Sequence, residues 1–242
     1  MSLSGLLDAI LPDPALSRAV SSAGADSLEL TAPASLRPFV VSALATDPSR
    51  GGAGRPVLAV TATGRDAEDL VDALRCVLPA DEVVGYPSWE TLPHERLSPR
   101  ADTVGRRLAV LRRLAHPSAD DAATGPVRVV VASIRAVLQP QVPGLGELEP
   151  VAAKVGDVLD LEDLVERLVA VGYARVELVE KRGEFAVRGG ILDVFPPTEE
   201  HPVRVEFWGD DVEEVRYFTV ADQRSLGPAD HGLWAPRAAS CC

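Results

Sequence analysis

Apolar residues follow two patterns in the first half of the chain. Helical spacing, with apolar residues three and four positions apart, predicts amphipathic helices. Uninterrupted, mainly apolar runs predict strands that are buried on both faces. The predicted helices cover residues 35–45, 66–78 and 102–114, and the predicted strands cover 57–62, 82–86 and 127–133. Strands that alternate with helices indicate a parallel sheet covered on both sides, which is an α/β fold.

The pattern changes after Pro140, where residues 139–146 have the composition of a linker. One helix is predicted over 161–171, opened by acidic residues, and short strands dominate after it. The predicted strands are 175–181, 184–188, 191–195, 203–208 and 212–218. Gly209 predicts a type II′ hairpin between the last two strands. This part therefore reads as a small α+β module.

These patterns predict a first domain at 1–147 and a second domain at 148–226. The last stretch, 227–242, shows no periodicity, so we expect it to be poorly ordered.

The segment 57–66 has the layout of a phosphate-binding loop, but it lacks the residues that hold phosphate. Aligned on Gly64, the P-loop pattern G-x-x-x-x-G-K-S/T has Ala59 at its first glycine, Arg65 at its lysine and Asp66 at its metal-binding hydroxyl. Further carboxylates in the first helical turn oppose a triphosphate. The segment predicts a degenerate nucleotide-binding domain with no cofactor. The alternative is an ordinary strand–turn–helix of an α/β protein.

The chain is acidic, with a net charge of −12 and a pI near 4.8. This charge disfavours tight DNA binding and suits a partner with basic patches. Arginine greatly outnumbers lysine, since only Lys154 and Lys181 occur, and Ala, Val and Gly are abundant. This composition suggests a GC-rich bacterial genome.

No cofactor or metal site is indicated by the reactive side chains. The three cysteines have neither disulfide-framework nor metal-ligand spacing, and the four histidines are scattered. We also find no signal peptide and no apolar run near the ~18 residues that a membrane span needs. The expected location is therefore the cytoplasm, without membrane association.

Two clusters offer a nucleic-acid interpretation beside a structural one. Tyr86 and Trp89, with Arg96 and Arg100, form an aromatic-basic loop that can stack on bases, although packing is the preferred interpretation. The predicted helix at 102–114 points four arginines away from its apolar face. A solvated helix surface is preferred there over a phosphate track. These arginines are Arg106, Arg107, Arg112 and Arg113, opposite Val104, Leu108, Leu111 and Leu114.

Long motifs in the second half carry a family resemblance. GYARVELVEKRGEFAVRGGILDVFPP at 172–197, VRVEFWGDDVEEVR at 203–216 and QRSL at 223–226 resemble the module shared by the nucleotide-excision-repair helicase UvrB and the transcription-repair coupling factors. YPSWETLPHE at 86–95 resembles the coupling factors rather than UvrB, and so does the degenerate P-loop. Over roughly residues 30–226 the chain is similar to the N-terminal UvrB-homology region of that family.

The resemblance implies a role in DNA repair. The family frees RNA polymerase stalled at a DNA lesion and recruits UvrA through this region. Its first domain is an inactive relative of a helicase fold. Its second domain binds UvrA and is masked by the far C-terminal part until activation. The polymerase-binding domain and the translocase motor lie later in the family, and the segment 235–242 does not resemble the expected continuation. A shortened gene product, a frameshifted end and an engineered fragment all fit that difference.

The resemblance also implies the residues that contact UvrA, which match Arg175, Phe185 and Arg188. Strand alternation places Arg188 on one face with Glu184, and Phe185 on the other. An arginine on a rigid strand suits bidentate pairing with carboxylates of a partner. The alternatives are a core aromatic for Phe185 and a solvated strand face for the arginines.

The favoured function is a non-catalytic scaffold that recruits UvrA. One rival is an ATP-dependent translocase that uses Arg65 in an atypical P-loop. Such a motor needs a metal-binding acid after a neighbouring strand and a second motor domain. The strand at 127–133 instead ends in Val131, Ala132 and Ser133. The other rival, direct binding of damaged DNA, is disfavoured by the acidic charge.

Overall fold

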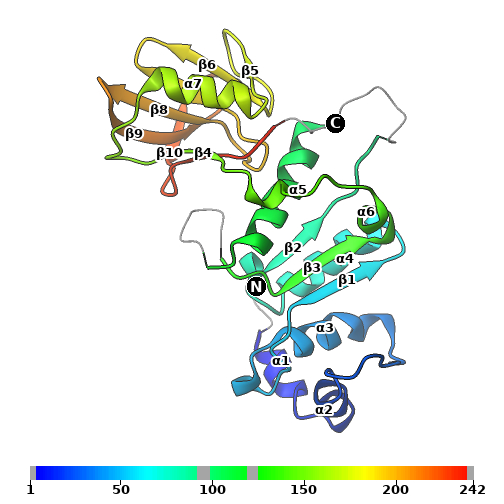
Figure 1. Cartoon of the computed structure of the whole chain (residues 1–242). Coiled ribbons are helices and arrows are strands. Elements are labelled where there is room, and N and C mark those ends of the chain that lie inside the picture. The colour runs from blue at the N-terminus through cyan, green and yellow to red at the C-terminus, as the bar shows by residue number, and fades with distance from the viewer. Residues whose placement is uncertain (1–3, 92–98, 119–124, 239–242) are drawn as a thin grey trace. The chain divides into compact units, whose positions relative to one another are not determined.

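The computed structural model describes residues 4–91, 99–118 and 125–238, which form two compact units (Figure 1). The described part of the first unit is 4–88 and 125–140. That of the second is 89–91, 99–118 and 141–238. The two units are therefore not separated at a single point in the chain, because residues 89–91 and 99–118 belong with the second half.

The first unit contains a small parallel sheet of three strands in the order β1-β3-β2. The strands are β1 (Val57–Thr61), β2 (Val83–Tyr86) and β3 (Val129–Ser133). The helices are α1 (Ser4–Ile10), α2 (Pro14–Ser21), α3 (Arg37–Ala45), α4 (Gly64–Arg75) and α6 (Ile134–Leu138), with 3₁₀ turns at Ala34–Leu36, Pro48–Arg50 and Ala80–Glu82. This arrangement confirms the α/β expectation for the first half.

Helices α3 and α4 supply the core on one face of this sheet. Leu74 of α4 and Ala43 of α3 are fully buried and lie in one cluster with Val129 and Val131 of β3. Strand β1 differs from the expectation of a strand buried on both faces, since Leu58 is 56% exposed. It is an edge strand whose alternate residues face away from α3 and α4.

Two short N-terminal helices were not predicted. The side chain of Asp13 accepts hydrogen bonds from the backbone N–H groups of Ala15 and Leu16, so it caps α2. Leu7 of α1 is fully buried in the core of the first unit. Helices of one to two turns are weakly specified by periodicity, so tertiary packing decides whether they form.

The second unit contains a six-stranded mixed sheet in the order β10-β9-β8-β7-β6-β5. Its strands are β5 (Ala174–Arg175), β6 (Glu184–Arg188), β7 (Ile191–Val194), β8 (Val203–Trp208), β9 (Asp211–Phe218) and β10 (Ser225–Pro228). Only the β5–β6 pairing is parallel. The remaining elements are α5 (Ala101–Ala115), α7 (Leu161–Ala170), a 3₁₀ turn at Leu145–Glu147 and the two-stranded ribbon of β4 (Val151–Ala153) and β11 (Leu233–Ala235).

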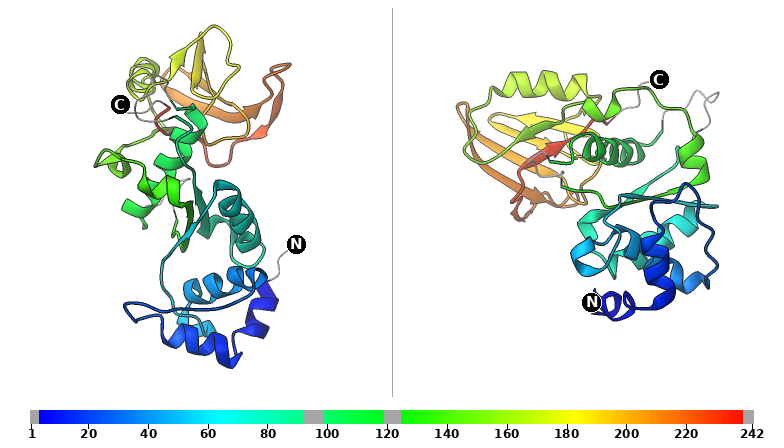
Figure 2. Two further views of the ribbon diagram at one scale, coloured as in Figure 1. Left: turned by 90° about the vertical axis from the view of Figure 1, so that its right-hand side faces the viewer. Right: turned by 60° about the horizontal axis from the view of Figure 1, so that its bottom comes forward.

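Helix α7 lies across one face of the six-stranded sheet (Figure 2). Asp160 caps its N-terminus by accepting from the backbone N–H groups of Glu162 and Asp163, as the acidic start of the helix predicts. Leu164 and Leu168 then pack in one buried cluster with the sheet and with the β4–β11 ribbon. This face of the sheet forms the core of the second unit.

Two expectations for the second half were wrong. Of the strand predicted at 175–181, only Arg175 is in a strand, as the second residue of β5, and 176–181 are irregular. The expectation of a poorly ordered tail fails for 227–238, because β11 pairs with β4 and Trp234 is only 8% exposed. The buried hydroxyl of Tyr173 also donates to the carbonyl oxygen of Pro236 at 2.9 Å. Residues 239–242 lie outside the described chain.

The prediction for the faces of α5 was partly wrong. Arg107, expected in solvent, is fully buried, and Leu114, expected inside, is 50% exposed. The guanidinium of Arg107 lies 4.2 Å from the ring centroid of Trp89, so an aromatic side chain accommodates the charge. On this helix, Gly105 permits a close approach, since a Cβ there would lie 2.4 Å from the Cβ of Pro197.

Candidate partner-binding site

The six-stranded sheet has a second face, opposite α7, which we call the outer face. The register places the residues of this face in rows that run across neighbouring strands. One row joins Arg188, Ile191, Glu206 and Glu214, and the next joins Ala186, Asp193, Arg204 and Arg216. The predicted alternation of β8, with Arg204 and Glu206 opposite Val203 and Val205, is thereby confirmed.

A buried carboxylate organises the centre of the outer face. The Asp193 side chain is 2% exposed. Its Oδ1 accepts from Nε of Arg204 at 2.6 Å, and its Oδ2 accepts from Nη2 of Arg204 at 2.8 Å and from Nη2 of Arg188 at 2.6 Å. Two guanidinium groups therefore satisfy one buried charge, as a buried carboxylate requires.

Arg204 is held from two further directions. Its guanidinium lies 4.5 Å from the centroid of the Phe218 ring, and Nη2 donates to Oε1 of Gln223 at 3.3 Å. The hydrogen bond to Asp193 raises the pKa of Arg204 above its ordinary value. In the same row as Arg204, Arg216 pairs with both Glu206 and Glu214 of the neighbouring row. The outer face is thus an ordered array of alternating charges.

Arg188 is the most exposed of the three arginines in this array. Its side chain is 47% exposed, although one of its nitrogens is tied to Asp193. Arg188 follows Glu184 and Ala186 on the same face of β6, as the alternation predicts. Arg204 holds the carboxylate of Asp193 in place. Because Arg188 donates to that same carboxylate, its exposed guanidinium is held in a fixed position.

The other two candidate contacts lie elsewhere. Phe185 is fully buried in the cluster that α7 covers, so the core alternative holds and a partner cannot touch its ring on the folded surface. Arg175 is exposed on the edge strand β5 and pairs with Phe185 in register. Residues that pair directly across neighbouring strands point to the same face of the sheet. The side chain of Arg175 therefore leaves the backbone on the face of Phe185, which is opposite the face of Arg188.

Loops cover part of the outer face and leave the rest open. A small apolar cluster of Val179, Ala186, Phe195 and Phe218 fills one end, with Val176 and Val220 packed against it. The row of Arg188 lies beyond that cluster, and its members Glu206 and Ile191 are only partly buried. The accessible part of the outer face therefore begins at Arg188.

The second candidate site is the turn between β1 and α4, which is only two residues long. Ala59, at the position of the first P-loop glycine, lies inside β1, and only Ala62 and Thr63 connect the strand to α4. The Thr63 hydroxyl donates to Oδ2 of Asp66 at 2.7 Å and accepts from the backbone N–H of Asp66 at 3.1 Å. A residue of the chain itself therefore places its negative charge at this helix N-terminus.

Strand β3 also lacks the acid that a nucleotide-dependent motor requires. It runs directly into α6, and Ser133 caps that helix by accepting from the backbone N–H of Ala136 at 3.3 Å. Among the described residues, no group of three or more His, Cys, Asp or Glu side chains is placed to hold a metal ion.

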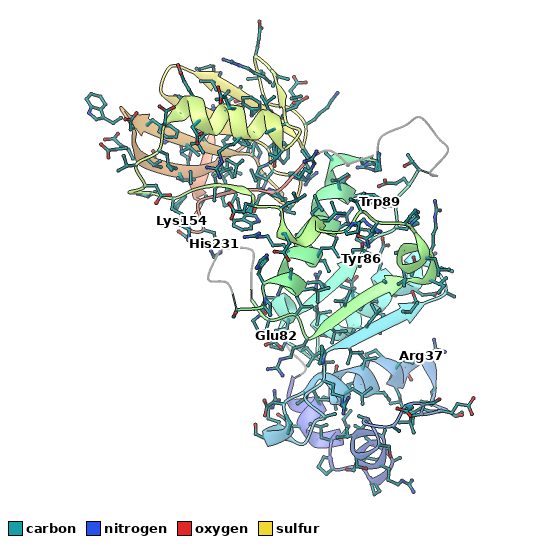
Figure 3. All side chains as sticks on the ribbon, viewed as in Figure 1. Arg37, Glu82, Tyr86, Trp89, Lys154 and His231 are labelled. Atoms are coloured by element: carbon teal, nitrogen blue, oxygen red, sulfur yellow. The ribbon has the colours of Figure 1, made fainter. Side chains whose placement is uncertain are left out.

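The aromatic-basic loop is mostly engaged in packing. Tyr86, at the end of β2, is only 8% exposed, and Trp89 contacts Arg107 as described above. Tyr86 and Trp89 are labelled in Figure 3. Arg100 is exposed and pairs with Asp102. Arg96 lies outside the described residues. The structure of Tyr86 and Trp89 therefore agrees with the preferred packing interpretation.

Sequence reasoning missed Asp193, Arg204 and Trp208. The exposed indole of Trp208 stands at the tip of the β8–β9 hairpin, where it is 74% exposed. Alternation in VRVEFW assigns Arg204, Glu206 and Trp208 to one face, so the signal for a mixed polar and aromatic face was present. What alternation does not reveal is whether that face is covered.

The geometry defines a class of protein module: a mixed sheet with one helix-covered core face and one charged face that is partly open. In the comparison with known proteins, the family described as the UvrB interaction domain matches residues 151–238. The transcription-repair-coupling factor of Mycobacterium bovis is 55% identical over 231 residues, covering 94% of this chain and 18% of the relative. That of Bacillus subtilis is 33% identical over 193 residues, covering 79% and 15%.

A UvrB protein is also similar. The UvrABC system protein B of Streptomyces avermitilis is 32% identical over 169 residues, covering 66% of this chain and 23% of the relative. The chain belongs to the transcription-repair coupling factors and corresponds to their N-terminal region with its UvrB interaction domain. It spans less than a fifth of the length of those relatives. No helix within the described ranges is long and apolar enough to cross a membrane.

Proposed function

We propose that this chain is a non-catalytic scaffold that recruits UvrA through the outer face, with Arg188 as its principal contact. The observation that carries the proposal is the half-exposed guanidinium of Arg188, which the buried carboxylate of Asp193 holds in place. Since the family match covers 151–238, the whole outer face lies inside the matched module.

The physical argument is preorganisation. An arginine usually loses side-chain entropy when it binds a carboxylate, and a guanidinium already fixed by one hydrogen bond loses less. The remaining N–H groups of Arg188 can pair with a carboxylate of the partner. Arginines in well-packed interfaces are frequent hot spots, whose truncation costs ~2 kcal/mol or more.

The first unit supports the non-catalytic part of the proposal. The short β1–α4 turn and the carboxylate of Asp66, which accepts a hydrogen bond from the N-cap residue Thr63, leave no cradle for a triphosphate. We therefore propose a degenerate, helicase-like nucleotide-binding domain that has kept its strand–turn–helix and lost its site. Contacts with RNA polymerase and DNA, which the resemblance implies for the full-length family, are assigned to the polymerase-binding domain and the translocase motor that lie later in the family.

A binding titration of UvrA against the parent chain and four variants tests the proposal. Arg188→Ala should weaken binding about tenfold or more, since this factor equals ~1.4 kcal/mol. Arg188→Lys should recover only part of the affinity, because an ammonium lacks the planar fork. Arg167→Ala is the matched control, because Arg167 is an exposed arginine on α7 with one weak ion pair to Asp163 at 3.9 Å.

Thermal melts accompany the titration, because Arg188→Ala also removes a charge-assisted hydrogen bond worth about 1–3 kcal/mol. Arg175→Ala serves as a second probe, and a loss of affinity would show that the partner wraps around the β5 edge. If folded Arg188→Ala binds UvrA as tightly as the parent, the outer face is not the UvrA site.

A further inference from the structure

Trp208 is an exposed aromatic on an otherwise well-packed module. It is 74% exposed, whereas Trp234 of the same unit is 8% exposed. Burying a tryptophan removes a large apolar area from water, and tryptophan is the residue most enriched in interface hot spots. Single exposed apolar residues are common on protein surfaces. The surroundings of Trp208 therefore decide whether its exposure indicates a binding surface.

The register places Trp208 on the outer face. It pairs with Asp211 of β9, and Asp211 pairs on its other side with Val158 in an isolated bridge. Directly paired residues of antiparallel strands point to the same face, so these three side chains form one further row. Val158 is 71% exposed. The row therefore presents a carboxylate between two exposed apolar side chains.

This row continues the surface proposed for UvrA. Trp208 follows Glu206 by two positions on β8, and Glu206 lies across Ile191 from Arg188. Neighbouring strands are ~5 Å apart and alternate residues of one strand ~7 Å apart. Trp208 and Arg188 consequently lie within the width of a standard protein–protein interface.

The backbone beneath this row is fixed by hydrogen bonds. The N–H of Leu159 donates to the carbonyl oxygen of Asp210 at 2.8 Å, and the N–H of Val212 donates to that of Asp157 at 2.9 Å. Gly209 has a φ of +64°, as the first central residue of a type II′ turn requires. The indole is thus presented from a rigid hairpin, which lowers the entropy lost when it is covered.

The charge around Trp208 indicates what covers it. Asp210, Asp211 and Glu213 are exposed at or beside the hairpin tip. A face of carboxylates around an indole complements a segment that carries arginine or lysine. The cation can stack on the ring while the carboxylates pair with its N–H groups.

We propose that Trp208 is the aromatic anchor of the UvrA-binding face and receives a cationic side chain of UvrA, with Asp211 as its counter-charge. This inference rests on the proposed function and adds a second contact, in which the charges of the two partners are the reverse of those at Arg188. Arg188 meets an acidic group of the partner, whereas Trp208 and Asp211 meet a basic one. The pair of contacts fixes the orientation in which UvrA docks.

The test is a titration of UvrA with Trp208→Ala, Trp208→Phe and Asp211→Asn, beside Arg188→Ala. Trp208→Ala should weaken binding about tenfold or more. Trp208→Phe should retain most of the affinity, because it keeps an aromatic face, and Asp211→Asn should reduce the dependence of binding on salt. Val169→Ala on α7 is the control, since Val169 is 55% exposed and lies on an element that covers the other face. The unfolding midpoints of the Trp208, Asp211 and Val169 variants should match that of the parent.

The outcomes separate the two proposals. If Arg188→Ala weakens binding and Trp208→Ala binds like the parent, the anchor is refuted while the UvrA site stands. If the parent itself fails to bind UvrA, both proposals fall. Sedimentation of the chain alone is the remaining measurement. A dimer that Trp208→Ala converts to monomers would assign the indole to a second copy of the chain and overturn the anchor.

Discussion

Replacing the buried carboxylate of Asp193 gives the sharpest test of how the outer face is built. Asp193 accepts three hydrogen bonds from two guanidinium groups while its side chain is 2% exposed. The Arg204 side chain is itself only 13% exposed. In Asp193→Asn the charge of Arg204 remains buried without its counter-charge.

The magnitude follows from that geometry. Removing one partner of a buried ion pair typically costs ~3–5 kcal/mol. Asparagine turns an NH₂ group toward the guanidinium donors, but it keeps one oxygen that accepts a hydrogen bond. Because of this retained acceptor we expect a loss of unfolding free energy at the lower end of that range, ~3 kcal/mol. For a chain of this length, 1 kcal/mol corresponds to about 2–4 °C in Tm, which predicts a loss of about 6–12 °C.

The assay is chemical denaturation followed by far-UV circular dichroism. Asp163→Asn provides the control, because Asp163 belongs to an exposed ion pair whose loss should cost less than ~1 kcal/mol. A double variant, Asp193→Asn with Arg204→Met, should be destabilised by less than the sum of the single changes, since no buried charge remains unpaired. If Asp193→Asn unfolds at the denaturant concentration of the parent, the network is not a stabilising element.

Three further predictions concern the core, the degenerate nucleotide site and alkaline pH. Phe185→Ala should lower the free energy of unfolding by ~3–5 kcal/mol, because the ring is fully buried; denaturation curves equal to those of the parent would disprove its core position. Titration with Mg-ATP in a calorimeter should release no binding heat, and micromolar binding abolished by changing Arg65 would contradict the degenerate site. Burial, together with nearby Glu199, raises the pKa of Tyr217 to about 12 from its ordinary 10.0. A raised folded-state pKa contributes stability that is complete below about pH 10 and lost as the pH rises toward 12. Tyr217→Phe should therefore flatten the loss of stability in that window, as measured by denaturation at several pH values.

Sequence patterns predicted those elements that are specified by residues within the element or directly beside it. The spacing of Leu74 and Val71 and the cap at Thr63 specify α4, and Asp160 with Leu164 and Leu168 specifies α7. Each of these signals lies within a few residues of the element. Local chemistry is sufficient for such helices because capping and amphipathicity act over one or two turns.

The failures share a physical cause, which is dependence on distant partners. Asp193 sits between apolar neighbours in β7, and its burial depends on Arg204, which lies eleven positions further along the chain. Arg107 is buried because Trp89 receives its guanidinium. The tail becomes ordered because β11 adds to β4, some eighty residues earlier. None of these partners can be identified from the periodicity of one segment.

The two faces of the six-stranded sheet explain why the charged residues form a surface and not a core. One face gains its stability from the apolar cluster beneath α7, which includes Phe185 and Leu192. The outer face is then free to carry charges, provided that each buried one is paired, and Asp193 meets this condition with Arg204. A fixed ion network restricts the motion of the exposed Arg188 and gives Trp208 a rigid neighbour. A surface of this kind stabilises the module little, but it presents opposite charges and an indole in a defined order, which is what selective binding requires.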